Sequence, residues 1–320
     1  MSPKILLLSC VVLVCGRLGA QTNVWQPSPG HKQMPIWPGA IPDAQAVPGP
    51  EAVLSNADWV VAGKPFAFVV NVSQPTMTVY PAKGPNAEVA VVVFPGGGYN
   101  ALAIDLEGTE ICDWLNAKGI TAVLLKYRVP TKPKVGPYSE SPQALEDAQR
   151  TLGLVRLHAA DWHINPHKIG VIGFSAGGHM VAATSTHFEK RAYAAVDAAD
   201  QESCRPDFAI ALYPGHLSPF QPDDPGSWRH ENQLELNPNI VVTSNTPPTF
   251  LLQAQNDPVD DIRNSMAYSL ALRNAKVPVE LHLYAEGGHG FGLRSTQSPI
   301  TAWPQLVATW LRTIGMIPAG

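Results

Sequence analysis

The sequence predicts a single α/β domain built on a mostly parallel, twisted sheet with helices on both faces. Short continuous apolar runs, typical of strands buried on both faces, alternate along the chain with stretches of helical spacing. The 320 residues are 45% hydrophobic and only 15% charged, which excludes intrinsic disorder for most of the length. No repeat of 20–50 residues is present, so solenoids and propellers are also excluded.

Each element follows from its local pattern. Strands are expected at the apolar or β-branched runs 66–72, 76–80, 88–94, 120–125, 168–173, 208–213, 248–254 and 279–284. Helices are expected at about 111–119, 141–160, 176–186, 262–275 and 301–314. Gly119 ends the first helix, and Ser141-Pro142 opens the second, because proline is well tolerated in a first helical turn.

The N-terminal region divides into two segments before this domain. Residues 1–20 have the pattern of a secretory signal peptide: Lys4 precedes a short apolar run, and Gly19-Ala20 offers a small-residue cleavage site. This pattern predicts a secreted or periplasmic protein. Residues 21–54 are rich in proline and read as an extended arm anchored by Trp25 and Trp37, leaving 55–320 as the α/β domain.

Charge and cysteine content exclude several classes of partner. The formal net charge of −4 gives no broad positive field for nucleic acid or for an anionic membrane surface, so neither is an expected partner once the signal is removed. Cleavage would leave Cys112 and Cys204, which are too few for a disulfide framework. Two buried thiols are favoured, although pairing between them stays open, as does the oligomeric state.

One segment breaks the alternation of strands and helices. Residues 214–246 contain several prolines and have no clear period, and they follow the end of a predicted strand, where ligands bind in open α/β sheets. The segment is therefore expected to be an irregular loop on the substrate side, with Trp228 and His230 as candidate substrate contacts. Packing against the N-terminal arm is the alternative.

The strongest chemical motif is Gly173-Phe174-Ser175-Ala176-Gly177, which matches G-x-S-x-G. A predicted strand precedes it and a predicted helix follows it, so Ser175 is expected on the sharp strand-to-helix turn that exposes a nucleophilic serine.

A serine nucleophile needs a base, and the base needs an acid to orient it, in the chain order Ser, Asp or Glu, His. Asp257 follows the predicted strand 248–254, and His289 follows the strand 279–284 in a glycine-rich loop. These residues are the expected acid and base, with Asp260 and Asp261 as rivals to Asp257. The other histidines are placed less well for this role.

Acyl transfer also needs backbone amides directed at the developing oxyanion. Gly96-Gly97-Gly98 follows the predicted strand 88–94, the usual location of such a loop. The amides of Gly97, Gly98 and Ala176 are therefore the expected oxyanion hole, and the neighbouring Tyr99 is a candidate substrate contact. No metal-ligand motif and no nucleotide-binding glycine pattern is present, so neither a metal nor a cofactor is expected.

Longer stretches of the chain resemble secreted α/β-hydrolases related to acetylxylan esterases, in the wider esterase/lipase and dienelactone-hydrolase-like superfamily. The resemblance rests on IWPG at 36–39, FPGGGY at 94–99, LAIDLEG at 102–108, LLKYRVP at 124–130, ALEDAQR at 144–150, GFSAGGH at 173–179, TPPTFLLQAQND at 246–257 and VPVELHLYAEGGHGFGL at 277–293. It implies an α/β-hydrolase fold and places the acid at Asp257. Asp105 and Glu107 match motif positions, and are expected to cap the first helix and support the oxyanion loop. The family usually carries a Val-Pro pair shortly after the acid, whereas Asp260-Asp261 stands here.

The signal-peptide pattern and the serine motifs predict a secreted serine hydrolase, and the resemblance to acetylxylan esterases implies that it removes acetyl groups from a plant polysaccharide or its oligosaccharides. The expected substrate is an acylated carbohydrate or a small ester. A feruloyl or aryl esterase, a prolyl-oligopeptidase-like peptidase and a noncatalytic carbohydrate-binding protein are the alternatives.

Overall fold

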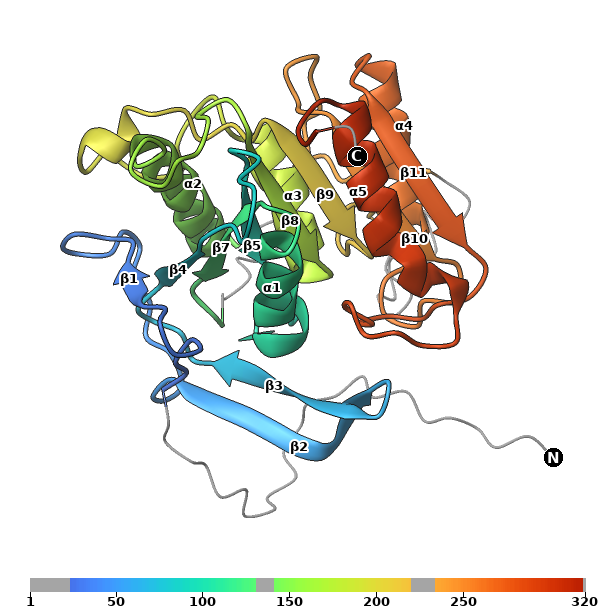
Figure 1. The fold of residues 1–320 in the computed structure, drawn as a ribbon, viewed down its shortest axis with the longest axis horizontal. Coiled ribbons are helices and arrows are strands. Elements are labelled where there is room, and N and C mark those ends of the chain that lie inside the picture. The colour runs from blue at the N-terminus through green and yellow to red at the C-terminus, as the bar shows by residue number, and fades with distance from the viewer. Residues whose placement is uncertain (1–23, 131–140, 220–233, 319–320) are drawn as a thin grey trace.

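The structure is a computed structural model and describes residues 24–130, 141–219 and 234–318. Its centre is an eight-stranded sheet in the order β1-β4-β7-β5-β8-β9-β10-β11 (Figure 1). Neighbours from β7 to β11 pair in parallel, whereas β1 and β4 are antiparallel additions at one edge. The predicted mostly parallel sheet is confirmed.

The strands of this sheet are β1 Gln33–Pro35, β4 Thr76–Tyr80, β5 Ala90–Phe94, β7 Thr121–Lys126, β8 Ile169–Phe174, β9 Phe208–Leu212, β10 Thr249–Ala254 and β11 Val279–Tyr284. Every residue of β5, β7, β8, β9 and β10 is buried, which explains their continuous apolar sequences. The edge strand β11 is only partly buried and alternates with polar residues.

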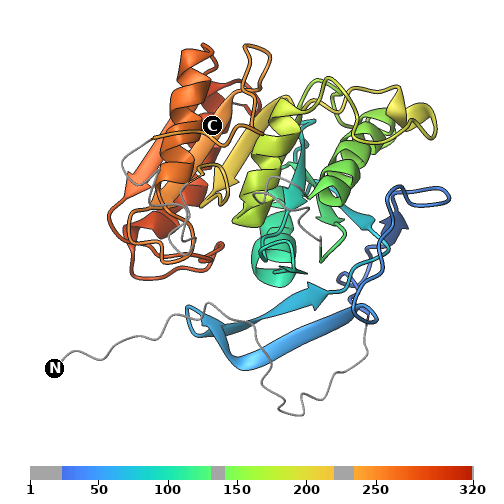
Figure 2. The same ribbon diagram turned by 180° about the vertical axis from the view of Figure 1, so that it is seen from behind.

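Helices cover both faces of the sheet. The helices are α1 Glu110–Asn116, α2 Pro142–Leu157, α3 Ala176–Thr186, α4 Arg263–Asn274 and α5 Trp303–Thr313. Helices α1 and α5 lie on one face, where Trp114 packs against Trp303, and α2, α3 and α4 lie on the other (Figures 1 and 2). Short helical turns occur at Asp105–Thr109, Ala198–Asp200 and Pro299–Ala302. Among the described residues, no helix is long and apolar enough to cross a membrane.

A second, three-stranded sheet lies apart from the main one and was not predicted as such. It consists of β2 Ala52–Val61, β3 Lys64–Val70 and β6 Ala101–Leu102, in the order β2-β3-β6 (Figure 1). The strand β2 escaped prediction because its polar residues interrupt any clear alternation. Its hairpin partner β3 corresponds to the expected strand at 66–72.

The N-terminal arm is more regular than predicted. Residues 33–35 form β1 on the sheet edge, where a proline is tolerated because one side of the strand needs no partner, and β2 begins at Ala52. Signal-peptide residues 1–20 lie outside the described part of the chain. The described parts of the 214–246 loop contain no helix or strand, as expected.

Trp37 attaches the arm to helix α2. Its indole is 5% exposed and donates a 2.8 Å hydrogen bond to the Asp147 carboxylate. Two guanidinium groups lie over the ring, that of Arg128 at 6.0 Å and that of Arg150 at 5.6 Å from its centre, and Arg128 also pairs with Asp147. Because every one of these side chains is buried, the arm is a fixed part of the fold at this point.

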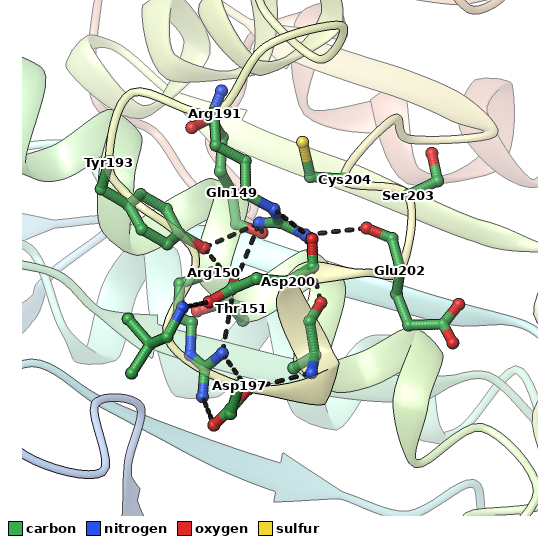
Figure 3. A network of polar contacts seen from close by, with 12 residues as sticks. Gln149, Arg150, Thr151, Arg191, Tyr193, Asp197, Asp200, Glu202, Ser203 and Cys204 are labelled. Atoms are coloured by element: carbon green, nitrogen blue, oxygen red, sulfur yellow. Dashed lines mark hydrogen bonds and ion pairs between the residues drawn. The ribbon is translucent and has the colours of Figure 1, made fainter.

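Arg150 also takes part in a larger polar network (Figure 3). Arg150 donates to the carbonyl of Ile36 in the arm and to both carboxylate oxygens of Asp197 at 2.6 Å. Asp200 accepts from Tyr193 and lies 3.1 Å from Arg150, so these contacts join α2, the arm and the segment before β9. Cys204, at the edge of this region, and Cys112 are both buried thiols, and no disulfide joins them.

Candidate active site

Ser175 lies between the end of β8 and the first residue of α3, as predicted. Its backbone has φ +53° and ψ −120°, a left-handed conformation that is strained for a residue with a side chain. The turn is tight enough that a Cβ atom at Gly177 would overlap the carbonyl oxygen of Phe94. Glycine is therefore required there, and the strained turn directs the hydroxyl away from the sheet.

Asp257 and His289 meet at the same end of the sheet. His289 Nδ1 donates a 2.8 Å hydrogen bond to Oδ2 of Asp257, and the other carboxylate oxygen accepts from the amides of Val259 and Asp260 at 2.9 and 3.0 Å. The Asp257 side chain is fully buried, whereas that of His289 is 15% exposed. The structure thus pairs His289 with Asp257, the acid that the sequence favours.

Two supporting residues were missed by sequence reasoning. Asn256 accepts hydrogen bonds from the amides of Gly287 and Gly288, both at 2.9 Å, and so ties the histidine loop to the loop that carries Asp257. Tyr213, at the end of β9, packs its ring 4.9 Å from that of His289. Neither belongs to a recognisable motif, because an asparagine beside an aspartate and a tyrosine after a strand are common patterns.

The glycine loop after β5 has the form expected of an oxyanion hole. Gly97 and Gly98 have φ values of +134° and +60°, and within the described residues neither amide donates a hydrogen bond to the protein. Ala176 is the first residue of α3, so its amide has no partner within the helix. All three amides are thus available to a ligand oxygen.

Glu107 holds the glycine loop through a buried hydrogen bond. It is 3% exposed, and it accepts a 2.8 Å hydrogen bond from the amide of Gly96 and another from the Tyr213 hydroxyl. Burial raises the pKa of Glu107, although both hydrogen bonds and the charge of His289 oppose that rise. Asp105 does not cap α1 as expected: its carboxylate accepts from the amide of Leu106 in its own turn and from the amide of Ala67 in strand β3.

The Ser175 hydroxyl donates to Asp260 rather than to His289. Its Oγ lies 3.4 Å from Oδ2 of Asp260, and no hydrogen bond joins it to the imidazole. The same Oδ2 is 3.8 Å from Nε2 of His289, so one carboxylate oxygen faces both reacting atoms. Asp260 is therefore part of the site, as a neighbour of Nε2 and not as the acid on Nδ1.

The site forms one wall of a cavity of about 560 Å³. Phe66 and Phe68 of strand β3, with Leu106, supply apolar lining to the cavity that also holds Ser175 and His289. The separate small sheet thus contributes directly to the pocket.

Other predicted site residues have different places. Tyr99 does not line the pocket: its side chain is 2% exposed, and its hydroxyl lies 2.7 Å from Nδ1 of His179, so it packs behind the glycine loop. The interpretation of Tyr99 as a substrate contact is therefore wrong. Trp228 and His230 lie outside the described residues, and their role stays a prediction.

The other histidines near the site are not candidates for the base. His216 lines the cavity, yet burial lowers its pKa to about 4. Burial, with smaller contributions from His216 and His187, lowers the pKa of His179 to about 3. Within residues 24–130, 141–219 and 234–318, no group of three His, Cys, Asp or Glu side chains could hold a metal ion.

The chain is similar to known carbohydrate-active hydrolases. A family model described as BD-FAE matches residues 77–215, and the prolyl oligopeptidase family model matches residues 149–314. The solved structure of an acetyl ester-xyloside bifunctional hydrolase from Caldicellulosiruptor lactoaceticus is 31% identical, with a TM-score of 0.66, and the match covers 89% of this chain and 97% of that one.

Two relatives are larger proteins. An acetylxylan esterase of Xylanibacter ruminicola is 30% identical over 70% of this chain and 45% of its own length. An endo-1,4-beta-xylanase B of Butyrivibrio fibrisolvens is 30% identical over 62% of this chain and 32% of its own length. The chain therefore spans less than half the length of either relative.

Fold and comparisons together define an α/β-hydrolase of the serine hydrolase class. The chain belongs to the prolyl oligopeptidase family, whose model covers more than half of it.

Proposed function

We propose that this protein is a secreted serine esterase that removes acetyl groups from a plant polysaccharide or its oligosaccharides. One observation carries the proposal: Ser175, on its strained turn, lines the same cavity as His289, which Asp257 binds. Gly97 and Gly98, whose amides have no partner among the described residues, line that cavity too. That combination supplies a nucleophile, an oriented base and an oxyanion site.

The first half of the reaction forms an acyl-enzyme. The Ser175 hydroxyl turns from Asp260 toward Nε2 of His289, which takes its proton as Oγ attacks the ester carbonyl carbon. The amides of Gly97, Gly98 and Ala176 bind the negative oxygen of the tetrahedral intermediate. His289 then gives its proton to the departing sugar oxygen, and the acetyl group stays on Ser175.

Water completes the cycle. His289 removes a proton from a water molecule, whose oxygen attacks the acetyl carbonyl, and the same amides bind the second oxyanion. Collapse of this intermediate breaks the bond to Oγ, and the proton on His289 returns to Ser175. Acetic acid leaves the site as acetate.

A sugar leaving group is supported by two lines of reasoning. The relatives named above include an acetylxylan esterase and an acetyl ester-xyloside hydrolase. The phenyl rings of Phe66 and Phe68 line the cavity, and burying the apolar face of a sugar ring against them would remove apolar surface from water.

A substrate panel tests this function. We expect the enzyme to release acetate from acetylated xylan and xylo-oligosaccharides, with much lower activity on methyl ferulate and on a proline dipeptide amide. Preference for methyl ferulate would favour an aryl esterase, and cleavage of the amide would favour a peptidase. Binding of acetylated xylan without acetate release would favour a noncatalytic protein. The Ser175→Ala variant is the blank for every substrate.

A further inference from the structure

A second carboxylate reaches the centre of this site. Asp260 lies on the loop after β10, three residues beyond Asp257, and its side chain points into the cavity. The residue is 4% exposed, and its carboxylate accepts one hydrogen bond from the described residues, the 3.4 Å bond from Ser175. A Cβ atom at Gly215 would overlap Oδ1 of Asp260, so the glycine there makes room for this carboxylate.

The imidazole of His289 is held between two acids. Asp257 binds Nδ1 at 2.8 Å, and Asp260 faces Nε2 at 3.8 Å. Among the described residues, Glu107, from the turn before α1, and the Tyr213 ring, from the end of β9, also lie near this imidazole.

None of the described residues that line this cavity is a lysine or an arginine. The ionisable groups near the ring are thus acidic or neutral, with the buried His216 also neutral near pH 7. This surrounding field favours a positive charge on the ring of His289.

We propose that Asp260 is a positioning residue of the catalytic site: it holds the Ser175 hydroxyl in the resting enzyme and stabilises the protonated form of His289, so that hydrolysis requires alkaline pH. The proposal rests on the esterase function proposed above. A protonated imidazole cannot accept the Ser175 proton. Each turnover therefore begins only in enzyme molecules in which Nε2 of His289 has released its proton to solvent. In these molecules the Ser175 hydroxyl has turned from Asp260 toward Nε2.

The ionisation of both groups supports this reading. Burial alone would lower the pKa of His289, but the hydrogen bond to Asp257 and the charges of Asp260, Asp257 and Glu107 raise it to about 9. Burial raises the pKa of Asp260 to about 6, against the opposing effects of His289 and Ser175. Between these two pH values, a negative Asp260 faces a positive His289.

The test is the pH dependence of kcat/KM for p-nitrophenyl acetate, corrected for the Ser175→Ala blank. The rising limb reports the free enzyme's base. We expect the midpoint of the wild-type rising limb to lie well above the ordinary imidazole pKa of about 6.5. Asp260→Asn removes the charge at nearly constant shape and should move the limb down by about 1–3 pH units, because that is the usual effect of a charge at this distance. Activity at pH 7 should then rise about tenfold or more, since one unit is tenfold in the neutral fraction.

Asp261→Asn is the matched control. Asp261 is the next residue along the chain, but its carboxylate pairs with Arg263 at 2.7 Å and makes no contact with His289. We expect its rising limb to coincide with that of the wild type.

Direct titration of the His289 ring by NMR, in wild-type and Asp260→Asn protein, gives a readout that does not need turnover. A wild-type ring that titrates near pH 6.5 would overturn the proposal even if the variant failed to fold. The proposal would also be overturned if the rising limbs of the wild type and of Asp260→Asn coincided, or if Asp261→Asn shifted the limb as much as Asp260→Asn does. Failure of the esterase function itself would look different: the wild type would not exceed the Ser175→Ala blank, whatever the ring titration.

Discussion

Replacing Glu107 by alanine tests whether the glycine loop depends on its buried support. Glu107 accepts from the Gly96 amide and from the Tyr213 hydroxyl, both at 2.8 Å, and it is 3% exposed. The alanine variant removes both acceptors and leaves two buried donors without partners, each at a cost of about 1–3 kcal/mol. The loop that carries Gly97 and Gly98 can regain hydrogen bonds for Gly96 only by shifting.

The expected loss can be worked out from this geometry. One oxyanion donor contributes about 2.7–4 kcal/mol, or about 10²–10³ in kcat. A shift that misaligns one glycine amide should therefore lower kcat for p-nitrophenyl acetate about 100-fold, with little change in KM, because the bond forms only in the transition state. Glu107→Gln keeps one carbonyl oxygen for the Gly96 amide and should lose less than about tenfold.

Steady-state kinetics are measured well below the melting temperature of each variant and on the plateau above its rising pH limb. These conditions separate the effect from unfolding and from the change in the pKa of His289 that loss of the Glu107 charge would bring. A Glu107→Ala enzyme with kcat within twofold of the wild type would refute the reasoning. Equal losses in the alanine and glutamine variants would also refute it, because the support would then depend on charge and not on the hydrogen bond to Gly96.

Two further predictions concern the arm and the pocket wall. Asp147→Ala leaves the buried Arg128 without its main carboxylate and Trp37 without its acceptor, and should destabilise the protein by about 3–5 kcal/mol, measured as the free energy of unfolding in urea. An unchanged urea midpoint would contradict the anchoring of the arm. Phe68→Ala should raise KM for acetylated xylo-oligosaccharides by about three- to tenfold, since losing about 30–50 Å² of apolar contact costs about 1 kcal/mol at ~25 cal/mol per Å². Ethyl acetate, whose leaving group carries no sugar ring to pack against Phe68, should be hydrolysed as before, and equal losses on both substrates would argue against a sugar-binding role of Phe68.

The buried half of the fold could be predicted from sequence because its signals are local. Strands such as Thr249–Ala254 are continuous apolar runs, and the expected bounds differ from the observed ones by one or two residues in most cases. Prediction failed for β2, whose residues are half-exposed and polar in part. It pairs with β3 as a hairpin, and Asp105 binds β3 through the amide of Ala67, a contact across 38 residues that no local pattern reveals.

In the candidate site, too, local signals could be predicted and long-range contacts could not. Ser175, Asp257 and His289 follow from a motif and from strand ends, because the geometry of a parallel sheet gathers those positions at one edge. Tyr99 was misread because its place beside the glycine loop says nothing about where its ring packs. The roles of Asn256 and Asp260 depend on side-chain directions within one short loop, which composition and spacing do not determine.

The most direct measurement of the central claim is mass spectrometry of the protein after reaction with a fluorophosphonate probe. We predict one adduct, on the peptide that contains Ser175, with complete loss of p-nitrophenyl acetate hydrolysis, and no adduct in Ser175→Ala. An adduct on another residue, or full ester hydrolysis by Ser175→Ala, would contradict the assignment of Ser175 as the nucleophile.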